Sequence, residues 1–199
     1  MSSKNPDQTP ITKDEVRDEL LIMMLAGSDT TSNAVRSSVY RALQTPGVYE
    51  KLIAEIDEAY LAGKVSRPVI TFDEAISLPY FSSFIKEVLR IDPSAPGIYP
   101  RVAPKGGYTL NGLFVPEGTV VSTNAWVNNR NKEVYGQDAD DFNPERWMES
   151  EEKSTTMENL SFTFGYGPRI CLGKNIALIE LHKVVFQVCR LKDFWTWSN

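Results

Sequence analysis

The sequence predicts a mainly α-helical fold with a small β-sheet. Long proline-free stretches before residue 45 and after residue 173 carry apolar residues at helical spacing. Between them, two short β-favouring runs flank Asn111-Gly112, a dipeptide that is typical of two-residue hairpin turns. The chain has 199 residues, of which 42% are hydrophobic and 24% charged, and this composition suits one globular domain with a sizeable core.

The first predicted helix runs from about Lys13 to Gln44. Thr12 followed by Glu15 has the pattern of a capping box at its start, and the Thr-Pro-Gly sequence at 45–47 ends it. Its apolar positions at helical spacing include Val16, Leu20, Met23, Met24, Ala34 and Val35. At about 1.5 Å per residue such a helix is roughly 45 Å long, so we expect it to cross the whole width of the domain.

Further helices are expected along the chain, because capping residues and prolines mark several of their ends. They are Val48–Leu61, a short capped turn over Thr71–Ile76, Pro79–Ile91, a short helix over Trp126–Tyr135, and Lys174 to about Leu191. The β-structure is expected in the middle, where Tyr108–Leu110 and Leu113–Val115 form a hairpin and Thr119–Ser122 a further strand. The acidic segment Asp138–Phe162 is predicted to be a long irregular loop.

Charge and cysteine content exclude several classes of protein. The net charge is -5, so the chain lacks the basic surface that nucleic-acid binding requires. The polar N-terminus and the short apolar run Leu20–Ala26 predict no signal peptide, no anchor and no membrane span in this chain. Cys171 and Cys189 do not make a disulfide framework, so each cysteine needs its own explanation.

The segment Phe164–Gly173 matches the pattern F-x-x-G-x-R-x-C-x-G at every fixed position. Glycines at 165, 167 and 173 permit positive φ and close approach of a flat ligand to the backbone. Cys171 lies just before a predicted helix N-terminus, where the helix dipole favours a thiolate. Arg169 adds positive charge that suits an anion such as a haem propionate. The segment therefore indicates a thiolate ligand for haem iron, and a buried structural cysteine is the weaker reading.

Three further segments strengthen this reading, and they carry a family resemblance. Ala26–Thr30 resembles the oxygen-activation motif A-G-x-[DE]-T, Glu87–Arg90 resembles E-x-x-R, and Pro144–Trp147 resembles P-E-R-F with tryptophan in place of phenylalanine. With the cysteine segment, these motifs occur in the order found in the cytochrome P-450 family of haem-thiolate monooxygenases, which the chain resembles. Within that family, residues 100–147 look most like fungal members of the pisatin demethylase type.

The resemblance implies the C-terminal part of the cytochrome P-450 fold. Its landmarks are a long central helix, the E-x-x-R helix, a β-hairpin, the cysteine-ligand loop and the helix that follows. We expect residues 1–11 to form a disordered lead and residues 12–199 a partial domain. The implied cofactor is haem b with Cys171 as axial ligand to the iron. The implied partners are an NADPH-cytochrome reductase, which supplies electrons from NADPH, and a small hydrophobic organic substrate.

The resemblance also assigns roles to individual residues. Asp29 and Thr30 are the implied catalytic pair that relays protons, with helix packing as the alternative for the Gly27–Thr30 face. Further implied cofactor contacts come from Ala26, Gly27, Arg101, Phe164, Gly165, Arg169 and Gly173. The alternative for Arg101 is a plain surface arginine. The alternative for Glu87 and Arg90 is a solvated surface pair.

The remaining candidates have structural or substrate-facing roles. The resemblance adds Arg146 to Glu87 and Arg90, which would make a buried charge network that locks the cysteine segment. Ile98 and Tyr99 are candidate pocket residues. His182, the single histidine of the chain, is interpreted as a surface or packing residue and Cys189 as a packing residue.

Family members are more than twice as long, so we expect this chain to be a segment that binds haem poorly and turns over no substrate alone. One alternative is a non-catalytic product of a truncated or split gene, and another is a haem-thiolate isomerase or dehydratase. Asp29 and Thr30 favour the oxygen-activating class over the last of these. The resemblance places the parent protein at the cytosolic face of the endoplasmic-reticulum membrane, although this chain lacks an anchor.

Overall fold

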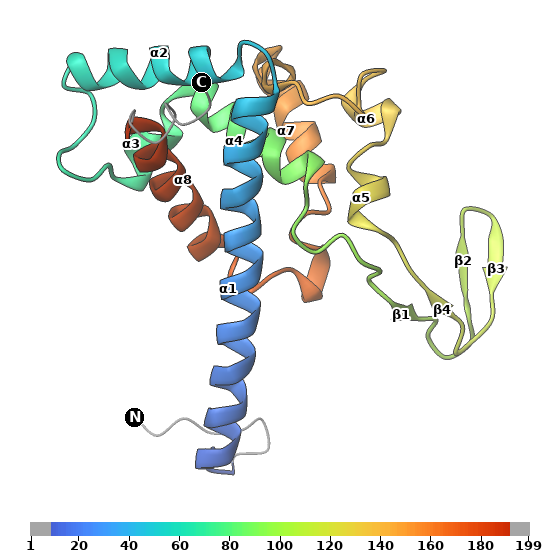
Figure 1. The fold of residues 1–199 in the computed structure, drawn as a ribbon. Coiled ribbons are helices and arrows are strands. Elements are labelled where there is room, and N and C mark those ends of the chain that lie inside the picture. Colours follow the sequence, from blue (N-terminus) through green and yellow to red (C-terminus); the bar gives the residue numbers. More distant parts are fainter. Residues whose placement is uncertain (1–8, 192–199) are drawn as a thin grey trace.

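The computed structural model describes residues 9–191, and it is mainly helical as the sequence predicts (Figure 1). The helices are α1 Lys13–Gln44, α2 Val48–Leu61, α3 Phe72–Ile76, α4 Pro79–Ile91, α5 Ala125–Asn128, α6 Lys132–Tyr135, α7 Glu151–Leu160 and α8 Lys174–Arg190, with 3-10 turns η1 Pro144–Met148 and η2 Gly167–Arg169. The strands are β1 Arg101–Val102, β2 Tyr108–Leu110, β3 Leu113–Val115 and β4 Val120–Val121. Most of the predicted lead 1–11 lies outside the described residues.

Helix α1 begins with the predicted capping box. The Thr12 hydroxyl accepts a hydrogen bond from the Glu15 N–H at 3.2 Å, and Glu15 Oε2 accepts one from the Thr12 N–H at 2.7 Å. The expectation that α1 crosses the whole domain is wrong. Only its C-terminal half packs, through buried Ala34, Ser38 and Ala42, while the apolar N-terminal half extends beyond the other helices (Figure 1). Its exposed apolar side chains include Val16, Leu20, Met23, Met24 and Leu25.

The main core lies where α2, α3, α4 and α8 meet the C-terminal half of α1. Phe81 of α4 meets Phe186 of α8 edge to face, with ring centroids 5.8 Å apart. His182 lies in this core, and its ring contacts Phe72 and Phe81 while Nδ1 lies 2.8 Å from the Leu178 carbonyl oxygen. His182 is therefore a packing residue, which is one of the two interpretations of the sequence.

The N-terminus of α4 is capped from another helix. Its N-cap residue is Leu78, which has no side-chain oxygen to accept a hydrogen bond. Glu55 of α2 supplies the missing acceptors, because its two carboxylate oxygens accept from Tyr80 N at 2.9 Å and Phe81 N at 2.7 Å. A carboxylate at this end also complements the helix dipole, so Glu55 fixes α4 against α2.

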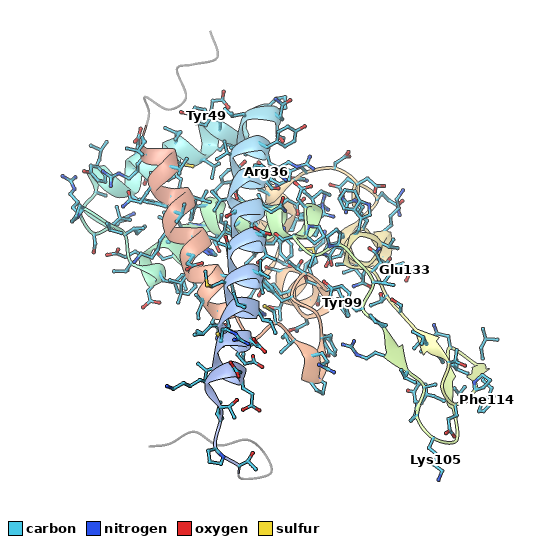
Figure 2. All side chains as sticks on the ribbon, turned by 60° about the horizontal axis from the view of Figure 1, so that its bottom comes forward. Arg36, Tyr49, Tyr99, Lys105, Phe114 and Glu133 are labelled. Atoms are coloured by element: carbon cyan, nitrogen blue, oxygen red, sulfur yellow. The ribbon has the colours of Figure 1, made fainter. Side chains whose placement is uncertain are left out.

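The β-structure consists of two separate antiparallel pairs instead of one small sheet. Strands β2 and β3 form the predicted hairpin, and positive φ angles of 48° at Asn111 and 79° at Gly112 make its turn. The hairpin projects from the body, with Lys105 and Phe114 far from the helices (Figure 2). Strand β4, expected over Thr119–Ser122, pairs with β1, which was not predicted.

The prediction of an irregular loop over Asp138–Phe162 is wrong for about half of that segment. It contains η1 and the ten-residue helix α7. Ser150 caps α7, because its hydroxyl accepts from the Lys153 N–H at 3.1 Å, and Glu151 and Glu152 occupy the first turn. The predicted helix over Trp126–Tyr135 is two four-residue helices, α5 and α6. Among residues 9–191, none of the helices is long and apolar enough to cross a membrane.

Candidate functional site

A buried ionic network joins α4 to the segment before α7. Glu87 and Arg90 lie three residues apart on α4, and Arg90 Nη2 and Nε donate to the two Glu87 oxygens at 2.7 and 2.8 Å. Arg146 of η1 donates through Nε to Glu87 Oε1 at 3.0 Å. All three side chains are at most 1% exposed, so the alternative of a solvated surface pair is wrong.

The two guanidinium groups also hold the surrounding backbone. Arg90 donates to the carbonyl oxygens of Asn129 at 2.8 Å and Ala139 at 2.6 Å, while Arg146 pairs with Asp138 at 3.0 Å. Burial acts to lower the pKa of Arg146, but the charge of Glu87 and the hydrogen bond to Asp138 outweigh it and raise the pKa above its ordinary value. Arg146 therefore stays charged, and the two guanidinium groups hold the loops around α4.

Trp147 is a member of this network that the sequence did not reveal. Its indole N–H donates to Glu87 Oε2 at 2.8 Å, and the side chain is buried. A phenylalanine at this position would have no donor for that bond. The tryptophan in the P-E-R-W sequence therefore adds a hydrogen bond to the central carboxylate that the phenylalanine of the family pattern could not make.

The cysteine segment is a tight turn that precedes α8. Gly165 and Gly167 have the predicted positive φ angles, 74° and 65°, and a Cβ at Gly165 would lie 3.4 Å from the Arg169 carbonyl oxygen. The Cys171 N–H donates to the Phe164 carbonyl oxygen at 2.8 Å and closes the turn. The expectation of positive φ at Gly173 is wrong, because its φ is -84° as the N-cap residue of α8.

The two cysteines lie in opposite environments. Cys171 is exposed and lies three residues before the first residue of α8. A Cβ at Gly173 would lie 4.0 Å from the Cys171 sulfur, so this glycine leaves room beside it. Cys189 is buried in the core, and burial raises the pKa of its thiol to about 12. Cys171 is thus the cysteine suited to a ligand role.

A cavity of about 240 Å³ lies between α1 and the cysteine segment. It brings together four predicted site residues, namely Thr30, Phe164, Arg169 and Cys171, and most of its wall is apolar. The other residues that line it are Thr31, Ala34, Leu89, Ser94, Ala95, Tyr99, Thr163, Ala177 and Leu181. Residues that are about 140 positions apart in sequence therefore face one cavity.

Other predicted site residues lie outside this cavity wall. Ala26, Gly27 and Asp29 lie on the exposed part of α1, and a Cβ at Gly27 would meet nothing within 4 Å. Arg101 is exposed on β1, where its Nη1 donates to the Pro100 carbonyl oxygen at 2.8 Å. Ile98 is 71% exposed and is not a wall residue, whereas its neighbour Tyr99 is.

Ser94 and Tyr99 fix the chain opposite Thr30. The Ser94 hydroxyl donates to the Thr30 carbonyl oxygen at 2.8 Å, and the Thr30 hydroxyl donates to the Ala26 carbonyl oxygen at 2.7 Å. The Tyr99 hydroxyl donates to the Ala95 carbonyl oxygen at 2.6 Å, and burial raises the pKa of this phenol. Ser94 had no sequence signal beyond its place after a helix-ending proline, so only the structure identifies it.

The residues present fit a haem. The thiol of Cys171 is accessible at an apolar cavity, and Arg169 beside it has no hydrogen-bond or ion-pair partner within residues 9–191. The cavity is smaller than the 300–1,000 Å³ of typical ligand pockets. The face of α1 at Gly27 is open, because a Cβ there would meet nothing within 4 Å. A cysteine sulfur, apolar walls, an arginine without a partner in residues 9–191 and an open helix face together suit an anionic haem.

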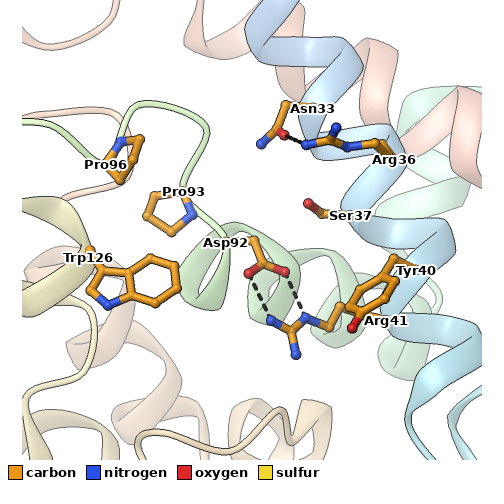
Figure 3. Close-up of a pocket in the computed structure, with 9 residues that line it drawn as sticks. All are labelled: Asn33, Arg36, Ser37, Tyr40, Arg41, Asp92, Pro93, Pro96 and Trp126. Carbon is orange, nitrogen blue, oxygen red and sulfur yellow. Dashed lines mark hydrogen bonds and ion pairs between the residues drawn. The ribbon is translucent and has the colours of Figure 1, made fainter.

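A second cavity, of about 380 Å³, lies on another side of α1 (Figure 3). Arg41 of α1 forms a bidentate pair with Asp92 at the end of α4, at 2.7 and 2.8 Å, and this pair raises the pKa of Arg41. Pro93, Pro96 and Trp126 complete the opposite wall. The Arg41–Asp92 pair in its wall joins α1 to the end of α4.

Comparison with known proteins identifies the family to which similar chains belong. A family model described as cytochrome P-450 matches residues 1–193. A cytochrome P-450 monooxygenase of Aspergillus terreus is 44% identical over 169 residues, covering 84% of this chain and 34% of the relative. Cytochrome P-450 monooxygenase ACRTS1 of Alternaria alternata is 38% identical over 96% of this chain and 50% of its own length. Pisatin demethylase of Fusarium vanettenii is 37% identical over 96% of this chain and 38% of its own length.

These matches agree with the resemblance seen in the four motifs, including the likeness to pisatin demethylase. The chain spans about half, or less, of the length of the curated relatives that it matches. The family model nevertheless covers nearly all of the chain. The chain therefore belongs to the cytochrome P-450 family.

Proposed function

We propose that this chain is the ligand-bearing part of a haem-thiolate monooxygenase. The proposed reaction inserts one oxygen atom from O₂ into a small hydrophobic organic substrate, with electrons from NADPH supplied by a reductase. The observation that carries the proposal is that the accessible Cys171 thiol and the Thr30 side chain line the same apolar cavity. The relatives named as monooxygenases support the same reaction class.

In this proposal, Cys171 Sγ would bind the iron of haem b. Arg169 and Arg101 pair with the propionates, and Phe164, Gly165 and Gly173 form the surface on the cysteine side. Ala26 and Gly27 form the surface on the α1 side, where the absence of a side chain at Gly27 lets a flat group approach the helix. Bound haem would supply the activation of O₂, which a thiolate ligand assists by donating electron density to the iron.

Proton delivery is assigned to Asp29 and Thr30. The Asp29 carboxyl is exposed, so it can take up protons from solvent. The Thr30 hydroxyl lies at the cavity and now donates to the Ala26 carbonyl oxygen at 2.7 Å. Rotation about its χ1 would free this hydroxyl to pass a proton into the cavity. This pair favours the oxygen-activating reaction over a haem-thiolate isomerase or dehydratase.

The buried network has a structural role in this proposal. Glu87, Arg90 and Arg146 hold the loops that surround the cysteine segment and do not touch the reacting atoms. We further propose that the longer parent acts at the endoplasmic-reticulum membrane, facing the cytosol. Because the chain spans only part of its relatives, the isolated chain should bind haem weakly and turn over no substrate.

The ligand assignment can be tested in a chimera. The matched segment of the Aspergillus terreus monooxygenase is replaced by this chain, so that the relative supplies the remaining length. The reduced CO complex of the chimera should show the red-shifted Soret band of thiolate ligation. Cys171→Ala should abolish that band, and the matched control Cys189→Ala should keep it. A thiolate-type band that survives Cys171→Ala would overturn the assignment, as would a haem-loaded chimera without that band.

The proton relay has its own test in the same chimera. Thr30→Ala should leave the CO spectrum unchanged, because the hydroxyl is not a ligand. It should lower the fraction of consumed NADPH that yields oxygenated product, since proton delivery is then impaired. Equal coupling in Thr30→Ala and the parent chimera would remove Thr30 from the mechanism.

A further inference from the structure

The amide side chain of Asn129 lies between the buried network and the cysteine segment. Asn129 is the C-cap residue of α5 and is completely buried. Its Nδ2 donates to the Arg90 carbonyl oxygen at 3.2 Å and to the Thr163 hydroxyl oxygen at 2.9 Å. Its Oδ1 accepts from the Phe162 N–H at 2.9 Å. One side chain thus makes three hydrogen bonds to two segments that are remote in sequence.

The backbone of Asn129 is held by the same network. Arg90 Nη1 donates to the Asn129 carbonyl oxygen at 2.8 Å, while the Asn129 side chain donates back to the Arg90 carbonyl oxygen. Arg90 is in turn paired with Glu87 at 2.7 Å. Arg90, a residue of the buried ionic network, therefore binds both the backbone carbonyl and the side-chain amide of Asn129.

A short path leads from Asn129 to the thiol. Phe162 and Thr163, which Asn129 binds, directly precede Phe164, and the Phe164 carbonyl oxygen accepts from the Cys171 N–H at 2.8 Å. The Thr163 hydroxyl also donates to the Leu89 carbonyl oxygen at 2.9 Å. The start of the cysteine turn is thus fixed to α4 and to Asn129 at two adjacent residues.

We propose that Asn129 is a positioning residue that couples the Glu87–Arg90–Arg146 network to the turn that presents Cys171. A primary amide suits this position because it offers two N–H donors and a carbonyl acceptor in one plane. Leucine has the same number of side-chain heavy atoms and none of these groups, and aspartate keeps the acceptor but loses both donors. The inference deepens the proposed function, since the turn it positions carries the proposed haem ligand.

The first test needs no haem and uses the chain itself. Alkylation rates of Cys171 and Cys189 are measured together with amide hydrogen exchange of Phe162 and Cys171. In Asn129→Ala and Asn129→Leu, both amides should exchange at least about tenfold faster, which corresponds to about 1.4 kcal/mol of local stability. Alkylation of the exposed Cys171 should also become faster, because the turn that presents its thiol is no longer held in place. Cys189, which is buried, reports global opening and should keep its rate.

Three further variants separate positioning from overall folding. Asn129→Asp should keep the Phe162 amide protected, because its carboxylate still accepts, while Cys171 still gains reactivity. Thr163→Val should reproduce part of the Asn129→Ala effect. In the double variant it should add little, because both substitutions remove the hydrogen bond between Asn129 and Thr163. The matched control is Asn128→Ala on the same helix, which removes a bond to the Leu160 carbonyl oxygen at 3.1 Å and should leave Cys171 unchanged.

Two results would overturn the inference. In the first, the Cys171 alkylation rate and the amide exchange rates of both Asn129 variants equal those of the parent chain. The other is an equal acceleration of Cys171 and Cys189 in the Asn129 and Thr163 variants, because Asn129 would then only support the overall fold.

A spectroscopic arm separates this inference from the proposed function. In the haem-loaded chimera, Asn129→Leu should convert part of the thiolate-type CO band to the thiol type without lowering haem content. A parent chimera without a thiolate band would refute the proposed function and leave the haem-free result on Asn129 in place. A parent chimera with that band and an unchanged Asn129→Leu spectrum would refute the positioning role alone.

Discussion

Replacing Trp147 with phenylalanine should destabilise the chain by about 2 kcal/mol, because hydrogen bonds to charged groups contribute about 1.5–3 kcal/mol. The indole N–H lies 2.8 Å from a Glu87 oxygen, and Glu87 is completely buried. Glu87 keeps its two donors from Arg90 and one each from Arg146 and the Asn143 backbone. The loss should therefore stay below the roughly 3–5 kcal/mol that follows removal of a charged partner.

Urea unfolding followed by far-UV circular dichroism measures this effect without relying on tryptophan fluorescence. Trp147→Phe should lower the midpoint and leave the slope unchanged, because the same surface is exposed on unfolding. A loss of about 2 kcal/mol raises the unfolded-to-folded ratio roughly thirtyfold.

The matched control for this prediction is Trp126→Phe. Trp126 is 45% exposed, and the Arg130 guanidinium carbon lies 3.5 Å from the centre of its ring. Losing part of such a cation–π contact should cost less than about 1 kcal/mol. If Trp147→Phe costs no more than Trp126→Phe, the bond to Glu87 has no net value and the reasoning is wrong.

Three further predictions use the same unfolding assay. Glu87→Gln should cost about 3–5 kcal/mol, because Arg90 then stays buried without an anion while Arg146 keeps only Asp138, and a cost below that of Trp147→Phe would contradict this. Glu55→Ala should cost about 1 kcal/mol and deprotect the first amides of α4, whereas unchanged amide exchange would show that Glu55 is no cap. Burial lowers the pKa of His182 in the folded state, so the unfolded state binds the proton first and stability should fall as the pH drops below about 6.5. His182→Leu should flatten this dependence, and an equally steep fall would assign it to other groups.

Much of the fold could be predicted because its signals are local. The capping box at Thr12, the prolines that begin α4 and end α1, and Asn111-Gly112 act within a few residues, and each boundary agrees with the structure. The cysteine motif is local in the same sense, since Gly165 and Gly167 take positive φ within one turn. The predictions failed where tertiary packing determines the structure. Examples are helix α7, which lies within the predicted irregular loop, and the N-terminal half of α1, which is exposed.

Sequence motifs pointed to individual residues of the candidate site, but not to the hydrogen bonds and the cavity that bring them together. Sequence motifs identified Thr30 and Cys171, and the structure brings both to one cavity with Ser94 and Tyr99, of which Ser94 was not foreseen. Arg101 remains an implied contact, because it lies on β1 outside the cavity wall.

The sequence by itself determined the family and the boundaries of the longer helices α1, α2 and α4, because these depend on residues that are close along the chain. Only the tertiary structure decided how the thiol is held. The bonds from Trp147 to Glu87 and from Asn129 to Phe162 join residues 60 and 33 positions apart. Neither a periodic pattern nor a short motif encodes such pairs, since they form only after α4 packs against the loops around it.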